Sequence, residues 1–286
     1  VPLTYAVLLA KPYWIRGAEM GASEWGVTIG NEAIFSKIPA GKNPELTGMV
    51  FRRLALERSK TAEEAVKVIV DLIEKYAQSG NCSQTHELYY HNSFLIADRK
   101  EAWVLETVDR EWAALKVKSV YAISNGLTIG NQWDIASENL VSRAINQGWC
   151  KNRDDFHFAR CYSDFLFTKF SQGHQRSACA LNALKASEGQ ISEMTMMAIL
   201  RSHGKDESSF QPDKGIFDWT VCMHQGWGPF RSSQSVGSMV SRLGGFIDTH
   251  WVTGTSAPCT SIFKPVWIDS GVPNTGGVPT NIFDNE

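Results

Sequence analysis

Residues Gly17 to Ala33 read Gly-Ala-Glu-Met-Gly-Ala-Ser-Glu-Trp-Gly-Val-Thr-Ile-Gly-Asn-Glu-Ala, and this stretch is the most informative part of the sequence. Its glycines surround a short run of β-forming residues, where they allow sharp turns and a close approach of the backbone to another group. Asn31 stands where such a strand ends. The pattern alone predicts a hairpin that carries either a buried polar cap or a site.

The stretch resembles the segment Gly-Ala-Glu-Met-Gly-Ala-Asn-Glu-x-Gly-Val-x-Ile-Gly-Asn-Glu-Ala of the secernins and their bacterial dipeptidase relatives. These proteins are similar to the N-terminal-nucleophile hydrolases penicillin V acylase and bile salt hydrolase. Ser23 stands where the family has Asn. The likeness covers nearly the whole chain and is weakest between residues 151 and 234. The further matching segments are residues 57–58, 70–76, 91–99, 101–107, 123–125 and 261–265.

The resemblance also implies a nucleophile that these residues do not supply. Members of the family start with a catalytic Cys, whereas this sequence starts with Val1 and with residues that look like a later strand of the family fold. The resemblance therefore predicts a cysteine dipeptidase or amidohydrolase whose nucleophilic Cys lies upstream. The alternative is a non-catalytic secernin-like protein with a binding or secretion-related role.

Composition excludes several classes of function. With 43% hydrophobic and 20% charged residues, the 286-residue chain has an ordinary globular composition. Its net charge of −2 comes from interspersed acidic and basic residues, so the sequence predicts no nucleic-acid or membrane partner. The apolar run at 5–10 is too short for a signal peptide or a membrane span. Six cysteines without CxxC pairs favour reduced thiols and a cytoplasmic protein. The sequence leaves open whether the protein forms a homo-oligomer.

Helix pairs that interrupt runs of strands predict an α+β domain rather than a doubly wound parallel sheet. The segment 46–58 and a second segment that begins with the capping-box residues Thr61 and Glu64 have helical periodicity. Further helices are expected within 134–170 and at 192–202. Strands are expected at 93–97, 102–107, 111–117, 220–224, 236–243, 249–253 and 262–268.

The family resemblance sharpens this fold to a four-layer αββα sandwich of the N-terminal-nucleophile hydrolase type. We expect one domain over residues 1–268 and a turn-rich tail over 269–286.

Asn31, Asn125 and Arg176 are the candidate catalytic residues that the resemblance implies. A side-chain amide can donate an N–H to the oxyanion of amide hydrolysis, and Asn31 and Asn125 match the two amide positions of the acylase relatives. An Asx turn before Gly126 is the structural alternative for Asn125. Arg176 corresponds to an arginine that holds a negative charge near the nucleophile, and a solvated surface arginine is its alternative.

Glu19 and Glu24 are the candidate substrate-binding residues. Either carboxylate can bind the ammonium group of a small peptide or amide substrate, and the alternative is that both cap backbone N–H groups.

Cys222 and His224 form a Cys-x-His pair that the predicted strand would place on one face. Such pairs are also routine core residues, and zinc would need a third and a fourth ligand. Cys82, His86 and His91 lack the spacing to supply them, so we expect no metal. No phosphate-binding glycine loop is present either, and we expect no cofactor.

Overall fold

The structure, a computed structural model, describes residues 3–43, 46–164, 173–204, 210–211, 220–226 and 233–271. Its largest part is an antiparallel sheet whose seven strands lie side by side in sequence order. The strands are β1 (Val7–Ala10), β2 (Met20–Ser23), β3 (Thr28–Ile34), β4 (His91–Ala97), β5 (Ala102–Val108), β6 (Glu111–Lys116) and β7 (Ile135–Ala136).

Helices and a second sheet make up the rest of the described structure. The helices are α1 (Gly48–Leu56), α2 (Ala62–Tyr76), α3 (Leu140–Asn146), α4 (Phe158–Tyr162), α6 (Gly173–Ala186) and α7 (Glu193–Arg201), and the 3-10 turns are η1 (Pro258–Thr260) and η2 (Ile268–Ser270). The second sheet has the order β10 (Lys264–Val266), β9 (Thr249–Thr253) and β8 (Ser238–Arg242). Antiparallel sheets combined with helices confirm the mixed α/β class. Within the described ranges, no helix combines the length and the apolar character needed to cross a membrane.

Helices α1 and α2 cover one face of the seven-stranded sheet. The Thr61 hydroxyl accepts a hydrogen bond from the Glu64 amide at 3.1 Å, so α2 begins at the predicted cap. The apolar stripe of α2 is buried, and Ile69 and Ile73 pack into a cluster with Phe94 of β4. Burial of each such side chain stabilises the fold by about 1.5–3 kcal/mol, which accounts for the position of both helices.

The opposite face of this sheet is covered in part by α3, α4 and the segment that follows β6. Val104 and Val108 of β5 alternate with the residues that face α2, so they point to this second side. They pack against Leu127, Ile129 and Leu140, which are all nearly fully buried. The two faces of one sheet therefore support two separate apolar clusters.

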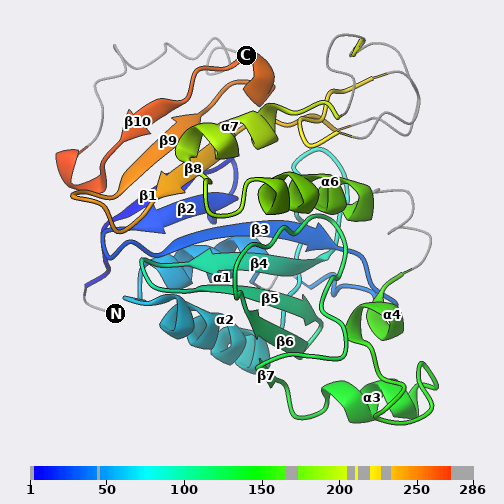
Figure 1. Cartoon of the computed structure of the whole chain (residues 1–286). Helices are drawn as coiled ribbons and strands as arrows, with labels where there is room; N and C mark the ends of the chain where they lie inside the picture. Colours follow the sequence, from blue (N-terminus) through cyan, green and yellow to red (C-terminus); the bar gives the residue numbers. More distant parts are fainter. Residues whose placement is uncertain are drawn as a thin grey trace.

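The three-stranded sheet lies beside β1 and β2, and α7 packs on β8 (Figure 1). Arg99, in the turn that follows β4, forms an ion pair of 2.8 Å with Asp248, which lies just before β9. Gly237, just before β8, approaches the side chain of Met20 on β2. These contacts hold the second sheet over the same end of the first sheet that carries residues 17–33.

Two sequence-based expectations differ from the structure. The segment 220–224 is irregular rather than a strand, because its backbone donates to separate loops instead of to a neighbouring strand. In the block 134–170, the described residues form the short strand β7 and the short helices α3 and α4, which are separated by a turn-rich stretch around Gly148 with φ of 69°. Residues 165–170 of that block, and most of the expected tail, lie outside the described residues.

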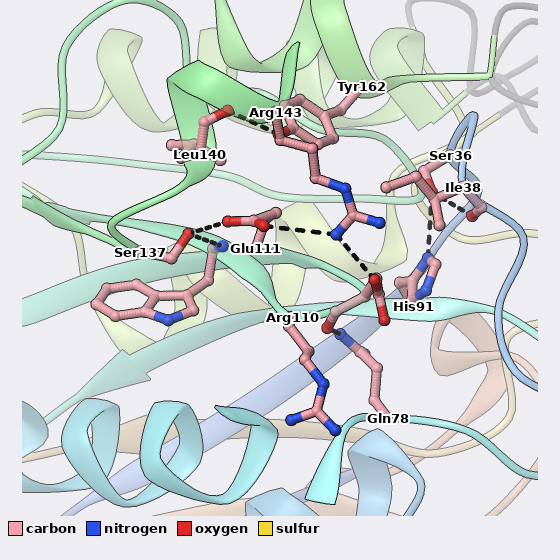
Figure 2. A network of polar contacts seen from close by, with 12 residues as sticks. Ser36, Ile38, Gln78, His91, Arg110, Glu111, Ser137, Leu140, Arg143 and Tyr162 are labelled. Atoms are coloured by element: carbon pink, nitrogen blue, oxygen red, sulfur yellow. Dashed lines mark hydrogen bonds and ion pairs between the residues drawn. The ribbon is translucent and has the colours of Figure 1, made fainter. Parts of the chain in front are cut away.

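A polar network fastens α3 to the turn between β5 and β6 (Figure 2). Arg143 of α3 donates to Asp109 at 2.9 Å and to Glu111 at 3.4 Å. Glu111 is nearly buried and also accepts from Ser137 at 2.6 Å, and Figure 2 shows its carboxylate between these two partners. The nearby hydroxyl of Tyr162 donates to the carbonyl of Leu140 at 2.7 Å. The network thus ties α3 and α4 to the edge of the sheet.

Replacing Arg143 by methionine should lower the free energy of unfolding by about 1–2 kcal/mol, since Glu111 then keeps a buried charge with one partner fewer. Urea denaturation measures the difference. Arg153→Met is the control because Arg153 is exposed, and it should change stability by less than about 0.5 kcal/mol. Equal stabilities of the Arg143→Met variant and the parent would contradict an anchoring role for this network.

Candidate active site

A cavity of about 510 Å³ lies between the two sheets and helices α6 and α7. Most of its wall is apolar, with contributions from Met20, Leu95 and Leu200. Gly30 of β3 also lines it, and a Cβ added there would meet no atom within 4 Å, so the glycine leaves the sheet surface open. Small-molecule sites have this size and this apolar character, with a few polar groups that orient the ligand.

The polar part of the wall is a connected group formed by Glu32, Asn125 and Arg176. Arg176 donates to the amide oxygen of Asn125 at 2.6 Å. The amide nitrogen of Asn125 donates to the carboxylate of Glu32 at 3.2 Å and to the carbonyl of Ala33 at 3.0 Å. Glu32 and Arg176 line the cavity, and Asn125 lies against both of them and holds their positions. Two of the three predicted catalytic residues are therefore in contact.

A glycine at the start of α6 brings Arg176 to this group. A Cβ on Gly173 would lie 2.7 Å from the backbone of Asn125, so only glycine allows the helix to begin that close to the 121–126 segment. Arg176 follows one turn later and points back toward Asn125. It is half-buried, and it lies within α6 rather than before a helix. The alternative of a solvated surface arginine is therefore wrong.

Burial and mutual attraction set the protonation of this group. Burial raises the pKa of Glu32, and the Arg176 guanidinium opposes the increase. Burial lowers the pKa of Arg176, and the Glu32 carboxylate opposes that decrease. Each group thus depends on the other to keep its charge next to an apolar cavity. A charged ligand that enters the cavity meets one positive and one negative side chain at the same wall.

The segment that carries Asn125 is anchored by the buried carboxylate of Glu106 on β5. Glu106 accepts from the Thr128 amide at 2.7 Å, from the Thr128 hydroxyl at 2.6 Å and from the Ile129 amide at 2.9 Å. The Thr128 hydroxyl is also 2.8 Å from that of Tyr121, which lines the cavity. Burial raises the pKa of Glu106 to about 7, despite these donors. One carboxylate therefore fixes both ends of the cavity-wall segment.

Asn31 points to the other face of β3. It pairs in register with Phe94, which packs under α1 and α2, while Glu32 pairs with Ser93 on the cavity side. The Asn31 amide donates to the side chain of Asn92 at 2.9 Å. A polar chain continues from Asn92 to Gln78 at 3.3 Å. Asn31 borders the cavity, but its amide bonds to Asn92 on the other face of β3, and its predicted role as an oxyanion donor stays a prediction.

The two candidate substrate-binding carboxylates differ in their surroundings. Glu24 accepts from the Ala6 amide at 2.8 Å, as the backbone-capping alternative expects, and it does not line the cavity. Glu19 lines the cavity, at the end of β2 that faces α1. Of the pair, only Glu19 is placed to contact a ligand in this cavity.

Arg52 on α1 is the largest fully buried side chain among the described residues. Within those residues its three guanidinium nitrogens have no hydrogen-bond partner. Burial lowers the pKa of Arg52 to about 9, and the charge of Glu19 opposes the decrease. A buried guanidinium without hydrogen bonds costs several kcal/mol, so this side chain is a source of instability in the described fold.

Replacing Arg52 by methionine should raise the free energy of unfolding by about 1–3 kcal/mol, since a flexible apolar side chain of similar length replaces a poorly solvated charge. Arg53→Met is the matched control. Arg53 pairs at the surface with Glu57 at 2.7 Å, and its loss should cost less than about 1 kcal/mol. Chemical denaturation at pH 7 compares the variants. A less stable Arg52→Met protein would mean that the guanidinium has a partner outside the described residues.

We expected no metal because the Cys-x-His pair lacked a third and a fourth ligand, and that reason is wrong. Cys222 lies 3.4 Å from His224, as the Cys-x-His pattern suggests, but on irregular backbone. The structure brings His203 and Cys259 to the same place, which supplies a third and a fourth ligand-type side chain. His203 lies 19 residues before Cys222, and Cys259 lies 35 residues after His224, so no local spacing pattern connects them with the pair. All six cysteines are free in the structure, and the expectation of reduced thiols stays a prediction.

Glu32 is the residue of the polar group that the sequence analysis missed. It follows Asn31 directly in the motif at 17–33. Both residues border the cavity, but side chains of neighbouring residues in a strand point to opposite faces, so only one of the two side chains was able to point toward Asn125. The signal that would have selected Glu32 is the alternation of β3, in which Ile29 and Asn31 share the face covered by α1.

Comparisons with known proteins agree with the resemblance seen in the sequence. One solved structure that the chain matches is penicillin V acylase from Agrobacterium tumefaciens, at 19% identity and a TM-score of 0.29. That match covers 40% of this chain and 33% of the acylase, so the chain spans about a third of the acylase's length. The model of peptidase family C69 matches residues 16–183, which is more than half of the chain and includes Glu32, Asn125 and Arg176. The chain belongs to peptidase family C69.

Proposed function

We propose that the protein is a secernin-like cysteine dipeptidase or amidohydrolase that hydrolyses C–N bonds of small peptides or related amides. The observation that carries the proposal is the contact of Arg176, Asn125 and Glu32 at the wall of the cavity, inside the region that matches a peptidase family. The family match supports the hydrolase class, and the charges of the cavity support the type of substrate.

The cavity suits a substrate with both an ammonium and a carbonyl group. Glu19 and Glu32 offer carboxylates for the ammonium group of a short peptide. Arg176 offers a positive charge where the tetrahedral oxyanion forms, and Asn125 holds that guanidinium at 2.6 Å. The rest of the wall is apolar, so it can accept apolar substrate side chains with little selectivity among them. A dipeptide or an amide of an amino acid has this combination of groups, since its free α-amine is protonated at neutral pH.

The nucleophile in this proposal is a cysteine thiolate that attacks the amide carbonyl, with a free amine as its base. None of the six cysteines of the chain lines the cavity. Cys150 and Cys161 lie in the apolar cluster of α3 and α4, which packs on the same face of the first sheet as the cavity but outside its wall. Cys222 and Cys259 lie beside histidines. We therefore place the nucleophile on a segment upstream of Val1, adjacent to Glu32 and Arg176.

The proposal includes the four-layer αββα arrangement. Helices α1 and α2 supply the first layer and the seven-stranded sheet the second. In this arrangement β8–β10 belong to the third layer, and α7, which packs on β8, belongs to the fourth. The cavity between the sheets then corresponds to the site between the two central layers.

Expression of the full open reading frame tests the function. The purified protein should hydrolyse members of a panel of dipeptides and N-acyl amino acids, and alkylation with iodoacetamide should abolish the hydrolysis. A control reaction, with substrate present during alkylation, should keep activity because the thiol is protected. If a correctly folded full-length protein hydrolyses nothing in the panel, the proposal fails and a non-catalytic binding role replaces it.

A further inference from the structure

Four side chains that commonly bind metals converge beside the second sheet. His203 follows α7, Cys222 and His224 belong to the irregular segment 220–226, and Cys259 lies in η1. One ligand atom from each residue lies within 4.8 Å of all the others. Cys222 is fully buried and the other three are half-buried. These residues are not part of the polar group at the cavity wall, so the cluster needs its own explanation.

Three distances in the cluster are close to those between the ligands of a tetrahedral zinc ion. The Nε2 atoms of His203 and His224 are 3.2 Å apart, and the Sγ atoms of Cys222 and Cys259 each lie 3.4 Å from Nε2 of His224. Zinc bonds of about 2.0–2.3 Å at tetrahedral angles place ligand atoms about 3.3–3.8 Å apart. These three distances are close to that range, and the remaining ones are at most 4.8 Å, so small adjustments of the side chains would let all four atoms bind one ion.

Hydrogen bonding among these residues does not account for the arrangement. A neutral imidazole nitrogen offers either one hydrogen or one lone pair. Nε2 of His224 is nevertheless approached by another imidazole nitrogen and by two sulfur atoms. One central cation satisfies all four groups together, because each presents a lone pair toward it. A set of two sulfur and two nitrogen ligands favours zinc among the common divalent metals.

We propose that His203, Cys222, His224 and Cys259 bind one Zn²⁺ in a closed, structural site. The backbone already holds the ligand segments together. The Cys222 amide donates to the carbonyl of Ser202 at 3.0 Å, which joins the first two segments. Ser235 joins the others, since its hydroxyl accepts from the Met223 amide at 3.0 Å and its carbonyl accepts from the Ala257 amide at 2.8 Å.

An aromatic ring shields one histidine of the site. Phe210 stacks on His203 with ring centroids 4.0 Å apart and an angle of 2° between the planes. Its centroid lies 5.3 Å from that of His224. An apolar cover limits the access of water and fixes ring orientation, which are the usual contributions of the surroundings of a metal site.

The part of the protein around the cluster has little other means of stabilisation. Among the described residues, the apolar cluster of α7 and the second sheet contains three buried side chains, Met197, Val240 and Phe263. A core that small supplies little stability by itself, and structural metals commonly compensate. Val221 and Pro258, each next to a ligand, line the cavity. Zinc would therefore also hold one wall of the proposed active site.

Metal analysis of the purified chain tests the proposal. The protein is prepared without chelators and without a polyhistidine tag, and zinc is measured by inductively coupled plasma mass spectrometry. We expect about one zinc ion per chain, and a decrease of at least about fivefold in Cys259→Ser and in His203→Gln, since each variant loses one of four ligands. Cys179→Ser is the control, because Cys179 lies on α6 and is not one of the four clustered residues, so its loss should leave zinc unchanged.

Cobalt substitution keeps the test decisive if the variants fail to fold. Wild-type protein that has been stripped of metal and loaded with Co²⁺ should show the visible bands of tetrahedral cobalt together with a thiolate charge-transfer band. Zinc in the wild type at well below one per chain, together with no cobalt spectrum, would overturn the proposal. So would a Cys222–Cys259 disulfide in a non-reducing peptide map. These readouts do not depend on hydrolase activity, so failure of the zinc site and failure of the proposed function are distinguishable.

Discussion

If the proposed dipeptidase activity holds, replacing Arg176 by glutamine in the full-length protein should lower kcat/KM for the best dipeptide substrate by about 10²–10³-fold, the usual cost of losing one group that stabilises an oxyanion. The reason is that Arg176 is the cation of the polar group at the cavity wall, and it also holds Asn125. Steady-state hydrolysis at several pH values measures the loss.

The pH profile gives this prediction a second readout. The guanidinium of Arg176 opposes the burial that raises the pKa of Glu32, so its removal should raise that pKa further. Any limb of the profile that reports ionisation of Glu32 should then move to higher pH.

Three further variants serve as comparisons. Arg153→Gln is the matched control, and this exposed side chain should be replaceable without a change in rate. Asn125→Ala removes the group that holds Arg176, and we expect a loss of about tenfold or more. Asn31→Ala examines the role predicted for Asn31, whose amide contacts Asn92 instead. An Arg176→Gln enzyme with parental kcat/KM would contradict the proposed site.

The stability of the protein should depend on pH through Glu106. Burial raises the pKa of this carboxyl to about 7 in the folded protein, against an ordinary value of 4.5. Below about pH 4.5 the group is protonated in both the folded and the unfolded chain, so its contribution is fully present. Between these values only the folded protein retains the proton, and stability is lost as the pH rises through about 7. Because each pKa unit is worth 1.36 kcal/mol, the total change is on the order of 3 kcal/mol.

Glu106→Gln isolates this contribution because glutamine does not titrate. Urea denaturation of the parent and the variant at pH 5, 6, 7 and 8 gives the difference in free energy of unfolding at each pH. The free energy of unfolding of the parent minus that of the variant should decrease by up to about 3 kcal/mol from the lowest to the highest pH. A constant difference, or one that grows with pH, would show that the hydrogen bonds from Thr128 and Ile129 keep Glu106 ionised.

Local patterns were sufficient to predict most of the first sheet and its two helices. The alternation in residues 93–117 gave three adjacent strands, and the Thr61 cap gave the start of α2. Both signals arise from neighbouring residues, so they survive in a single sequence. The prediction of a strand at 220–224 was wrong for the opposite reason. Its β-type residues lie in an irregular segment because tertiary contacts through Ser202 and Ser235 override local propensity.

The site was predictable only where a family motif marked a residue. Asn125 and Arg176 entered through the resemblance, and their contact across 51 positions required the fold. Glu32 was missed because the motif drew attention to Asn31, which faces the other side of the strand. His203 and Cys259 carried no signal, since a metal site assembled from distant loops has no fixed spacing.

The most direct test of the account is to find which residue a substrate-like electrophile modifies. The full-length protein is treated with a dipeptide chloromethyl ketone, with and without excess substrate, and the modified residue is identified by peptide mass mapping. We predict one modified cysteine, upstream of Val1, and protection of it by substrate. Modification of a cysteine within the present chain, or no modification of an active protein, would contradict it.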